Sequence, residues 1–176
     1  MKFNVPSYSQ YLDIKNKEWQ DRACGIIALK SILDFWSDEN KKIYPDGDKL
    51  VEIGLELNAY IPDIGWRHKE LVDIAKSLDL DGKNFDWFKK TPEEAFQKMF
   101  PYLEKYPLAA SVHPLFETQN QGGHLVVLTG FENNILYYND PASEIREEIA
   151  QEIPLDNFLK GWKRRIIAIY PKSADL

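Results

Sequence analysis

Apolar side chains recur at helical spacing in the segment that follows the single cysteine of the chain. The apolar face consists of Ile26, Ile27, Ala28, Leu29, Ile32, Leu33, Phe35 and Trp36. A narrow polar stripe at i, i+4 and i+7 is made by Lys30, Asp34 and Ser37. The pattern predicts a largely buried helix over residues 24–36, with Asp21 as its N-cap.

The segments on either side of this helix are more polar. Residues 1–23 are expected to be extended, because Val5 precedes a proline and the residues after it are turn-prone. Within them, residues 15–18 read as an exposed loop. Residues 37–47 are charged and rich in turn formers, so they are expected to be a second loop.

Two amphipathic helices are predicted next. The first covers residues 49–58 with Asp48 as its N-cap, and the second covers residues 69–79. His68 stands at the start of the second helix, where a histidine is more often a cap or a surface residue than a catalyst.

A capping box predicts the start of a fourth helix. Thr91 is the N-cap, Pro92 takes the first position and Glu94 the third. Pro101 is expected to break or kink this helix. The apolar residues 85–88, just before it, are expected to form a short strand.

The second half of the chain is strand-rich, and its order of elements sets the fold class. Because helices come first and antiparallel strands follow, we predict an α+β fold in one domain over residues 1–176, with the N-terminal helices packed on a C-terminal antiparallel sheet. The predicted elements are strands at 108–112, 124–131, 135–139 and 165–170, with a short helix at 154–161.

One predicted hairpin brings a histidine close to an acid. A three-residue turn would pair Phe131 with Ile135, so that paired residue numbers sum to 266 and Val126 faces Asp140. His124 then points to the same face as the diagonal neighbour of Asp140. A slip of one residue would place the two side chains on opposite faces. A histidine at a strand start and an acid in an Asp-Pro turn are also common structural features.

Cys24 falls in the first turn of the buried helix, where free backbone N–H groups and the helix dipole favour a thiolate. Gly25 leaves room beside the sulfur. The alternative is core filling, which is the usual role of a buried cysteine. As base for the thiol we favour His124 over His113, because a proline follows His113 and no acid lies in a paired position.

Composition limits the classes of function. The net charge is −6 and the longest basic run is residues 163–165, which argues against a nucleic-acid partner. One cysteine and three scattered histidines argue against a disulfide or a metal site, and we expect no cofactor. No apolar stretch is long enough to span a membrane. No signal peptide is evident, which predicts a cytoplasmic protein, a trimmed form of a secreted one being the alternative. The oligomeric state is left open.

Four motifs together resemble the papain-like cysteine peptidases related to bacteriocin-leader peptidases, in particular free-standing bacterial members. They are Val-Pro-x-x-x-Gln at 5–10, Ala-Cys-Gly with its apolar helix at 23–36, Gly-Gly-His-Leu-Val-Val at 122–127 and Asn-Asp-Pro-Ala-Ser at 139–143. The stretch Gly-Trp-x-His-Lys at 65–69 is also similar to that branch. Transporter-linked members cut after a double-glycine leader and often have proline after Cys-Gly, where this chain has Ile26.

The resemblance implies Cys24 as nucleophile, His124 as general base and then acid, and Asp140 as the residue that orients the histidine. It also implies a glutamine side chain beside the Cys24 N–H in an oxyanion hole, with Gln10 as first choice and Gln20 as second. The implied activity is hydrolysis of peptide bonds in a peptide or protein substrate through a thioester. Two alternatives stay open: a catalytically silent peptide-binding module, and an acyl transfer or transglutaminase-type reaction with the same residues. Three tryptophans either line a cleft or fill the core, namely Trp19, Trp66 and Trp87.

Overall fold

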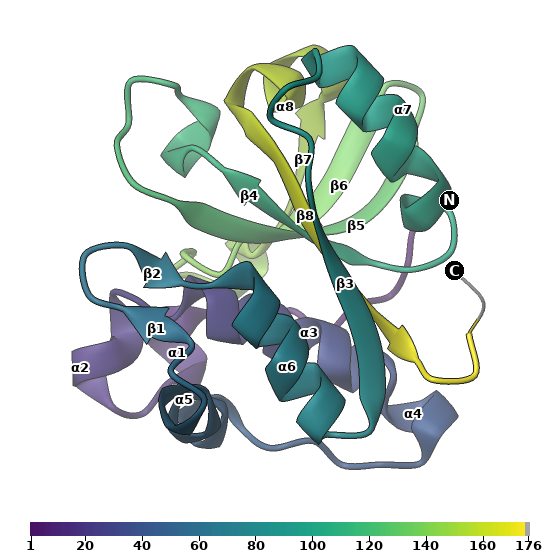
Figure 1. Ribbon diagram of the computed structural model, residues 1–176. Helices are drawn as coiled ribbons and strands as arrows, with labels where there is room; N and C mark the ends of the chain where they lie inside the picture. Colours follow the sequence, from purple (N-terminus) through teal and green to yellow (C-terminus); the bar gives the residue numbers. More distant parts are fainter. Residues whose placement is uncertain (175–176) are drawn as a thin grey trace.

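A six-stranded antiparallel sheet with the order β3-β8-β4-β5-β6-β7 dominates the second half of the computed structural model, which describes residues 1–174. Helices dominate the first half, so the predicted α+β class is confirmed. In Figure 1, α3, α5 and α6 lie below the sheet, while α7 and α8 lie above it. The strands are β3 (Leu80–Asp86), β4 (Leu108–Val112), β5 (His124–Glu132), β6 (Ile135–Asn139), β7 (Ala150–Pro154) and β8 (Trp162–Pro171).

The helices differ widely in length. The long ones are α3 (Cys24–Phe35), α5 (Gly47–Glu56), α6 (His68–Ser77) and α7 (Pro92–Leu103). The short ones are α1 (Gln10–Asp13), α2 (Lys17–Gln20), α4 (Ser37–Asn40), α8 (Leu155–Gly161) and the 3-10 turns η1 (Pro114–Phe116) and η2 (Arg146–Glu148). A separate ribbon of two residues per strand joins β1 (Tyr60–Ile61) to β2 (Gly65–Trp66). No helix in residues 1–174 is long and apolar enough to cross a membrane.

Helix α3 is the centre of the packing. Nearly all of its apolar positions are buried, and it packs against β5 of the sheet. The indole N–H of Trp36, just after the helix, donates to the carbonyl of Ile169 in β8 at 2.9 Å. Burial of this face anchors the start of α3, and with it Cys24, against the sheet.

Two of the predicted caps are wrong. Asp21 ends α2, while α3 begins after Ala23 without any side-chain cap. Helix α5 begins after Asp46, whose carboxylate accepts from the Lys49 N–H at 2.9 Å. Asp48 instead accepts from the backbone N–H groups of residues 15 and 16. In both cases the residue that precedes the helix is not the predicted acid but one two residues away in the sequence.

Several short elements differ from the sequence prediction. Residues 1–23 contain α1 and α2 rather than extended chain only, and residues 17–18 belong to α2 rather than to a loop. Residues 37–40 form α4. The predicted strand at 85–88 is the end of the longer β3, which stops at Asp86. Helix α7 has the predicted capping box and continues through Pro101, whose missing N–H falls in the last turn.

The β5–β6 hairpin turns more tightly than predicted. Glu132 pairs with Ile135, so the turn has two residues rather than three. Both of them, Asn133 and Asn134, have positive φ (50° and 62°), as the two-residue hairpin turn requires.

A bulge in β5 then restores the expected register. Leu128 pairs with Tyr138 and Gly130 with Tyr137, which leaves Thr129 as the extra residue. Its carbonyl accepts the N–H of Phe3 at 2.7 Å. Beyond the bulge Val127 faces Asn139, so paired numbers sum to 266 at the end of the hairpin that carries the histidine.

Candidate active site

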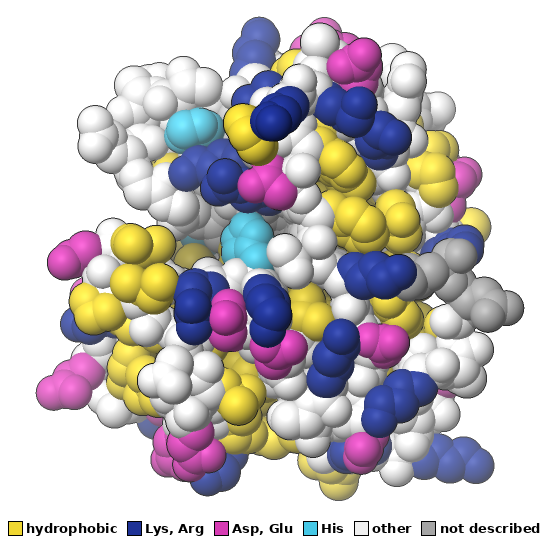
Figure 2. Space-filling view, viewed as in Figure 1, with side chains coloured by type: hydrophobic (Ala, Val, Ile, Leu, Met, Phe, Trp, Pro, Cys, Tyr) yellow, Lys and Arg dark blue, Asp and Glu magenta, His cyan; other side chains and the backbone are white. Residues whose placement is uncertain are grey.

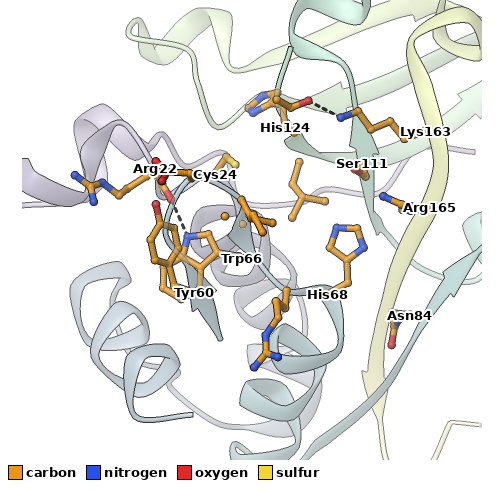
Figure 3. Close-up of a pocket in the computed structure, with 18 of the residues that line it drawn as sticks. Arg22, Cys24, Tyr60, Trp66, His68, Asn84, Ser111, His124, Lys163 and Arg165 are labelled. Carbon is orange, nitrogen blue, oxygen red and sulfur yellow. Dashed lines mark hydrogen bonds between the residues drawn. The ribbon is translucent and has the colours of Figure 1, made fainter. Parts of the chain in front are cut away.

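A cleft of about 790 Å³ opens between the N-terminal helices and the sheet. The space-filling view shows it as a hollow across the middle of one face (Figure 2), and the close-up shows the side chains that project into it (Figure 3). One wall comes from the start of α3, from β2 and from the start of α6. The other comes from β4, β5 and β8. Cys24 and His124 face each other across one end of this cleft.

Cys24 is the first residue of α3, so no carbonyl within the helix uses its N–H. The backbone N–H groups of Gly25 and Leu125 work to lower the pKa of the thiol, because they stabilise the thiolate. A Cβ at Gly25 would lie 3.0 Å from the Cβ of Trp66, so glycine lets the helix start press against the tryptophan. The thiol is partly exposed to the cleft.

His124 is the first residue of β5, and its Nε2 lies 2.6 Å from Oδ1 of Asp140. The same carboxylate oxygen accepts the Ala142 N–H at 2.9 Å. Because Nε2 faces the carboxylate, Nδ1 is the ring nitrogen left to interact with Cys24. The structure thus brings together the three side chains that the sequence selected, in the order sulfur, imidazole, carboxylate.

The three groups shift one another's pKa. Burial alone would raise the pKa of the Cys24 thiol, but the hydrogen bond with His124 and the imidazolium charge outweigh it and lower the pKa. Burial would lower the pKa of His124, yet Asp140 and Cys24 together raise it to about 10. Burial also works against ionisation of Asp140, and the bond to His124 nevertheless holds the pKa of the carboxyl below its usual value. All three net shifts favour a thiolate beside an imidazolium.

The loop that carries Asp140 is fastened to the N-terminal segment. The Gln10 N–H donates to the Pro141 carbonyl at 2.8 Å, and the Ser9 hydroxyl donates to the Ser143 carbonyl at 2.6 Å. The side-chain amide of Asn139 reaches the carbonyls of residues 5 and 6. The motifs at 5–10 and 139–143 are therefore two halves of one contact.

The two candidate glutamines have different surroundings. Gln20 Nε2 donates to the carbonyls of Tyr11 and Ile14 at 3.2 and 2.8 Å, which uses both of its hydrogens. Gln10 Nε2 makes one such bond, to the Gln20 carbonyl at 2.7 Å, and its Oε1 is buried without a partner. The Gln10 side chain is buried, its amide lies beside the Tyr11 hydroxyl, and it does not line the cleft.

The three tryptophans divide between wall and core. Trp66 lines the cleft and its indole N–H donates to the Arg22 carbonyl at 2.7 Å. Trp19 supports it from behind, with ring centroids 5.7 Å apart, and both rings contact Tyr60. Trp87 lies outside the cleft and stacks on Phe85.

Three residues of the cleft were not selected from the sequence. His68 projects into its middle, where burial and the charge of Arg165 lower the pKa of the imidazole (Figure 3). Lys163 and Arg165 stand on the sheet side. Of the three, only His68 stands in a sequence motif, the Gly-Trp-x-His-Lys stretch at 65–69. His113 lies away from this cleft, with Nδ1 at 3.3 Å from the Asn120 carbonyl. Among the described residues, no group of three acids, histidines or cysteines is arranged to hold a metal ion.

A thiol at a helix start, facing an imidazole at the start of a sheet strand, is the arrangement of the papain-like peptidases. The sequence confirms this class more narrowly: residues 2–166 match the Peptidase_C39 like family, and the chain belongs to that family. A comparison with curated proteins finds no match.

Solved structures with the same fold include members of this family. A C39-like peptidase from Bacillus anthracis is 19% identical, with TM-score 0.65 over 98% of this chain and 96% of that one. A double glycine motif protease from an AMS/PCAT transporter, solved in complex with the leader peptide, is 21% identical, with TM-score 0.62 over 97% and 94%. The peptidase domain of Streptococcus ComA, a bifunctional ABC transporter, is 19% identical, with TM-score 0.59 over 86% and 93%. At these identities the likeness shows the shared fold.

Proposed function

We propose that this protein is a cysteine peptidase that hydrolyses peptide bonds with Cys24, His124 and Asp140. The observations that carry the proposal are the 2.6 Å contact between His124 Nε2 and Asp140 Oδ1, and the position of Cys24 and His124 in the lining of one open cleft. The pKa of the thiol lies below its ordinary value and that of the imidazole above it, and both shifts favour the thiolate before substrate arrives.

In the first step the Cys24 thiolate attacks the carbonyl carbon of the scissile peptide bond. The electron pair of the carbonyl moves to its oxygen, which the Cys24 N–H and the side-chain amide of Gln10, once turned toward the cleft, would stabilise. The intermediate then collapses, the C–N bond breaks, and the imidazolium of His124 protonates the departing amine. A thioester between Cys24 and the acyl half of the substrate remains.

In the second step His124, now neutral, takes a proton from water, and the hydroxide attacks the thioester carbonyl. The C–S bond breaks and the thiolate is restored beside the imidazolium. Asp140 keeps the ring oriented throughout and supports its positive charge. A peptide is the fitting substrate class, because a family member with the same fold binds a leader peptide in its solved complex.

The test compares the wild-type protein with Cys24→Ala on internally quenched peptides of randomised sequence, with and without a Gly-Gly pair. We expect cleavage by the wild type and none by the variant, together with a thioester adduct on Cys24 seen by mass spectrometry. Equal turnover by the two proteins, or no turnover by either, overturns the proposal.

The same thioester also serves acyl transfer, and the acceptor distinguishes the two reactions. With a primary amine added to the reaction, a hydrolase releases mainly the free acid, whereas a transferase releases mainly the amide. We expect the free acid, because the cleft is open to water beside the thiol.

A further inference from the structure

A bulge in β8 takes two basic residues out of the strand pairing close to the cleft. Ser111 of β4 pairs with Arg165, but the next residue, Val112, pairs with Trp162, which leaves Lys163 and Arg164 without partners in that ladder. Arg164 adopts φ of 57°, a left-handed conformation that is uncommon for a residue with a side chain. Bulges of this kind turn side chains toward functional surfaces.

The bulge borders a second hollow of about 370 Å³ whose charged lining is entirely basic. The basic residues are His113, Lys160, Lys163, Arg164 and Arg165, while the apolar walls include Phe88, Leu159 and Trp162. No carboxylate lines this hollow among the described residues. A cluster of cations costs electrostatic free energy, and this one persists in a chain with a net charge of −6.

The cations of the hollow are mostly unpaired within the described chain. Arg165 bonds Asp86 at 2.8 Å, but Lys163 donates only to the Gly122 carbonyl. Arg164 gives one N–H to the Lys90 carbonyl at 3.0 Å, and its Nε is buried without a partner. Burial and the charge of Arg165 lower the pKa of Lys163. The hollow therefore keeps donors and charge that an anion would satisfy.

The hollow adjoins the candidate active site. Lys163 and Arg165 line both the hollow and the cleft. Lys163 reaches the backbone of the Gly-Gly segment that leads into His124 (Figure 3), and a Cβ at Gly123 would lie 4.0 Å from its Nζ. Figure 2 shows Lys and Arg side chains gathered above the central hollow. A chain lying in the cleft can thus continue past Lys163 into the basic hollow.

We infer that this hollow is a subsite for acidic side chains of the peptide substrate, so that the enzyme selects peptides with glutamate or aspartate a few residues from the scissile bond. The inference deepens the proposed peptidase function and rests on it. Carboxylates on the substrate would supply partners for Lys163 and Arg164, and would offset the repulsion among the Lys and Arg side chains of the hollow.

The experiment measures binding, so it does not depend on turnover. Full-length Cys24→Ala protein is titrated against fluorescein-labelled eight-residue peptides by fluorescence anisotropy. Each peptide carries a central Gly-Gly pair and two glutamates, either before or after that pair, and has a counterpart with glutamine in place of glutamate. We expect one glutamate peptide to bind about tenfold tighter than its glutamine counterpart, with the advantage shrinking as salt is added.

Two charge-removing variants locate the effect. Lys160→Gln with Arg164→Gly removes two cations from the hollow, and glycine accepts the φ of 57°. Lys49→Gln removes one exposed cation from α5 and serves as the control. The preference for glutamate over glutamine peptides should fall to about twofold in the double variant and stay unchanged in the Lys49→Gln control. Circular dichroism verifies that the variants fold. Lys160→Gln alone changes an exposed position and should at least halve the preference for glutamate over glutamine peptides.

Several outcomes overturn the inference. Equal binding of glutamate and glutamine peptides does so, and so does a preference that survives in the double variant. Inorganic phosphate that binds at the hollow without any such preference would mark a site for a free anion instead. A protein that shows the preference but cleaves no peptide in its wild-type form contradicts the proposed function and leaves the subsite standing.

Discussion

The backbone N–H of Gln10 donates to the carbonyl oxygen of Pro141, 2.8 Å away, and so joins the N-terminal segment to the loop that holds Asp140. The Ser9 hydroxyl and the Asn139 amide add further bonds across the same contact. Asp140 thus depends for its position on residues about 130 places earlier in the chain. A substitution in the N-terminal segment should therefore alter the orientation of the His124 ring through Asp140, without any direct contact with the ring.

Ser9→Ala tests this dependence. The hydroxyl accepts from the N–H groups of Tyr11 and Leu12 and donates to the Ser143 carbonyl, so its loss should lower the free energy of unfolding by about 1–3 kcal/mol. It should also lower kcat in the folded protein. Urea unfolding and peptide cleavage measure the two effects. Thr91→Ala, which removes the cap of the distant α7, should cost similar stability and leave kcat intact.

The ionisation of Cys24 is open to a clean chemical measurement, since it is the only cysteine. At pH 6 a free thiol with a pKa of about 8.5 is about 0.3% ionised. The folded protein should react with iodoacetamide far faster than this, because its thiol pKa is lowered and the imidazolium persists up to about pH 10. In His124→Ala the rate of reaction with iodoacetamide at pH 6 should be at least about tenfold lower than in the wild type. If the folded wild-type protein reacts with iodoacetamide at pH 6 no faster than the same protein unfolded in guanidinium, Cys24 and His124 do not form an ion pair.

Asp140→Asn keeps a hydrogen-bond acceptor for His124 but removes the negative charge. The charge of Asp140 helps to raise the pKa of His124 to about 10, so the variant should titrate lower. The reactive form needs the imidazolium, which exists only below that pKa. The alkaline limb of the kcat/KM profile should therefore move to lower pH, and the maximum should fall by about 10²- to 10⁴-fold. If the alkaline limb stays in place, Asp140 does not raise the pKa of His124.

The sequence could predict those parts of the fold whose signals are local. The capping box at Thr91 and the apolar runs of β4 and β5 carry such signals. Strand β7 was missed because it is an exposed edge strand with no apolar alternation. The short helices α1 and α2 were missed because four residues are too few for a periodic pattern.

The predicted placement of His124 beside Asp140 was right only because two one-residue differences cancel. The three-residue turn was wrong by one residue, and the bulge at Thr129 shifts the pairing back by one. As a result His124 and Asp140 share a face as expected. The bulge at Lys163 and Arg164 had no sequence signal, because the pairing that creates it joins strands 50 residues apart. Distant pairings of this kind are visible only in the folded chain.

Trp66 should govern both the stability of the protein and the shape of the cleft. The indole packs over two glycines, since a Cβ at Gly25 would meet its Cβ at 3.0 Å and one at Gly54 its ring at 2.5 Å. Trp66→Ala should cost about 3–5 kcal/mol of unfolding free energy through the cavity it leaves. Trp66→Phe keeps most of the packing and loses the bond to the Arg22 carbonyl, so it should cost about 1–3 kcal/mol. Urea unfolding that ranks the two variants equally would contradict this account.

Gln10 and Gln20 form a matched pair that separates catalysis from structure. Gln10 is the proposed side-chain donor to the oxyanion, so Gln10→Ala should lower kcat by about 10²- to 10³-fold with little change in KM. Gln20 spends both N–H groups on Tyr11 and Ile14, so Gln20→Ala should cost about 1–3 kcal/mol of stability and leave kcat of the folded fraction within about threefold. Steady-state kinetics and urea unfolding on both variants give the comparison. If the larger loss of kcat falls on Gln20, the oxyanion is stabilised by a different donor from the one proposed, and the N-terminal segment serves only to position Asp140.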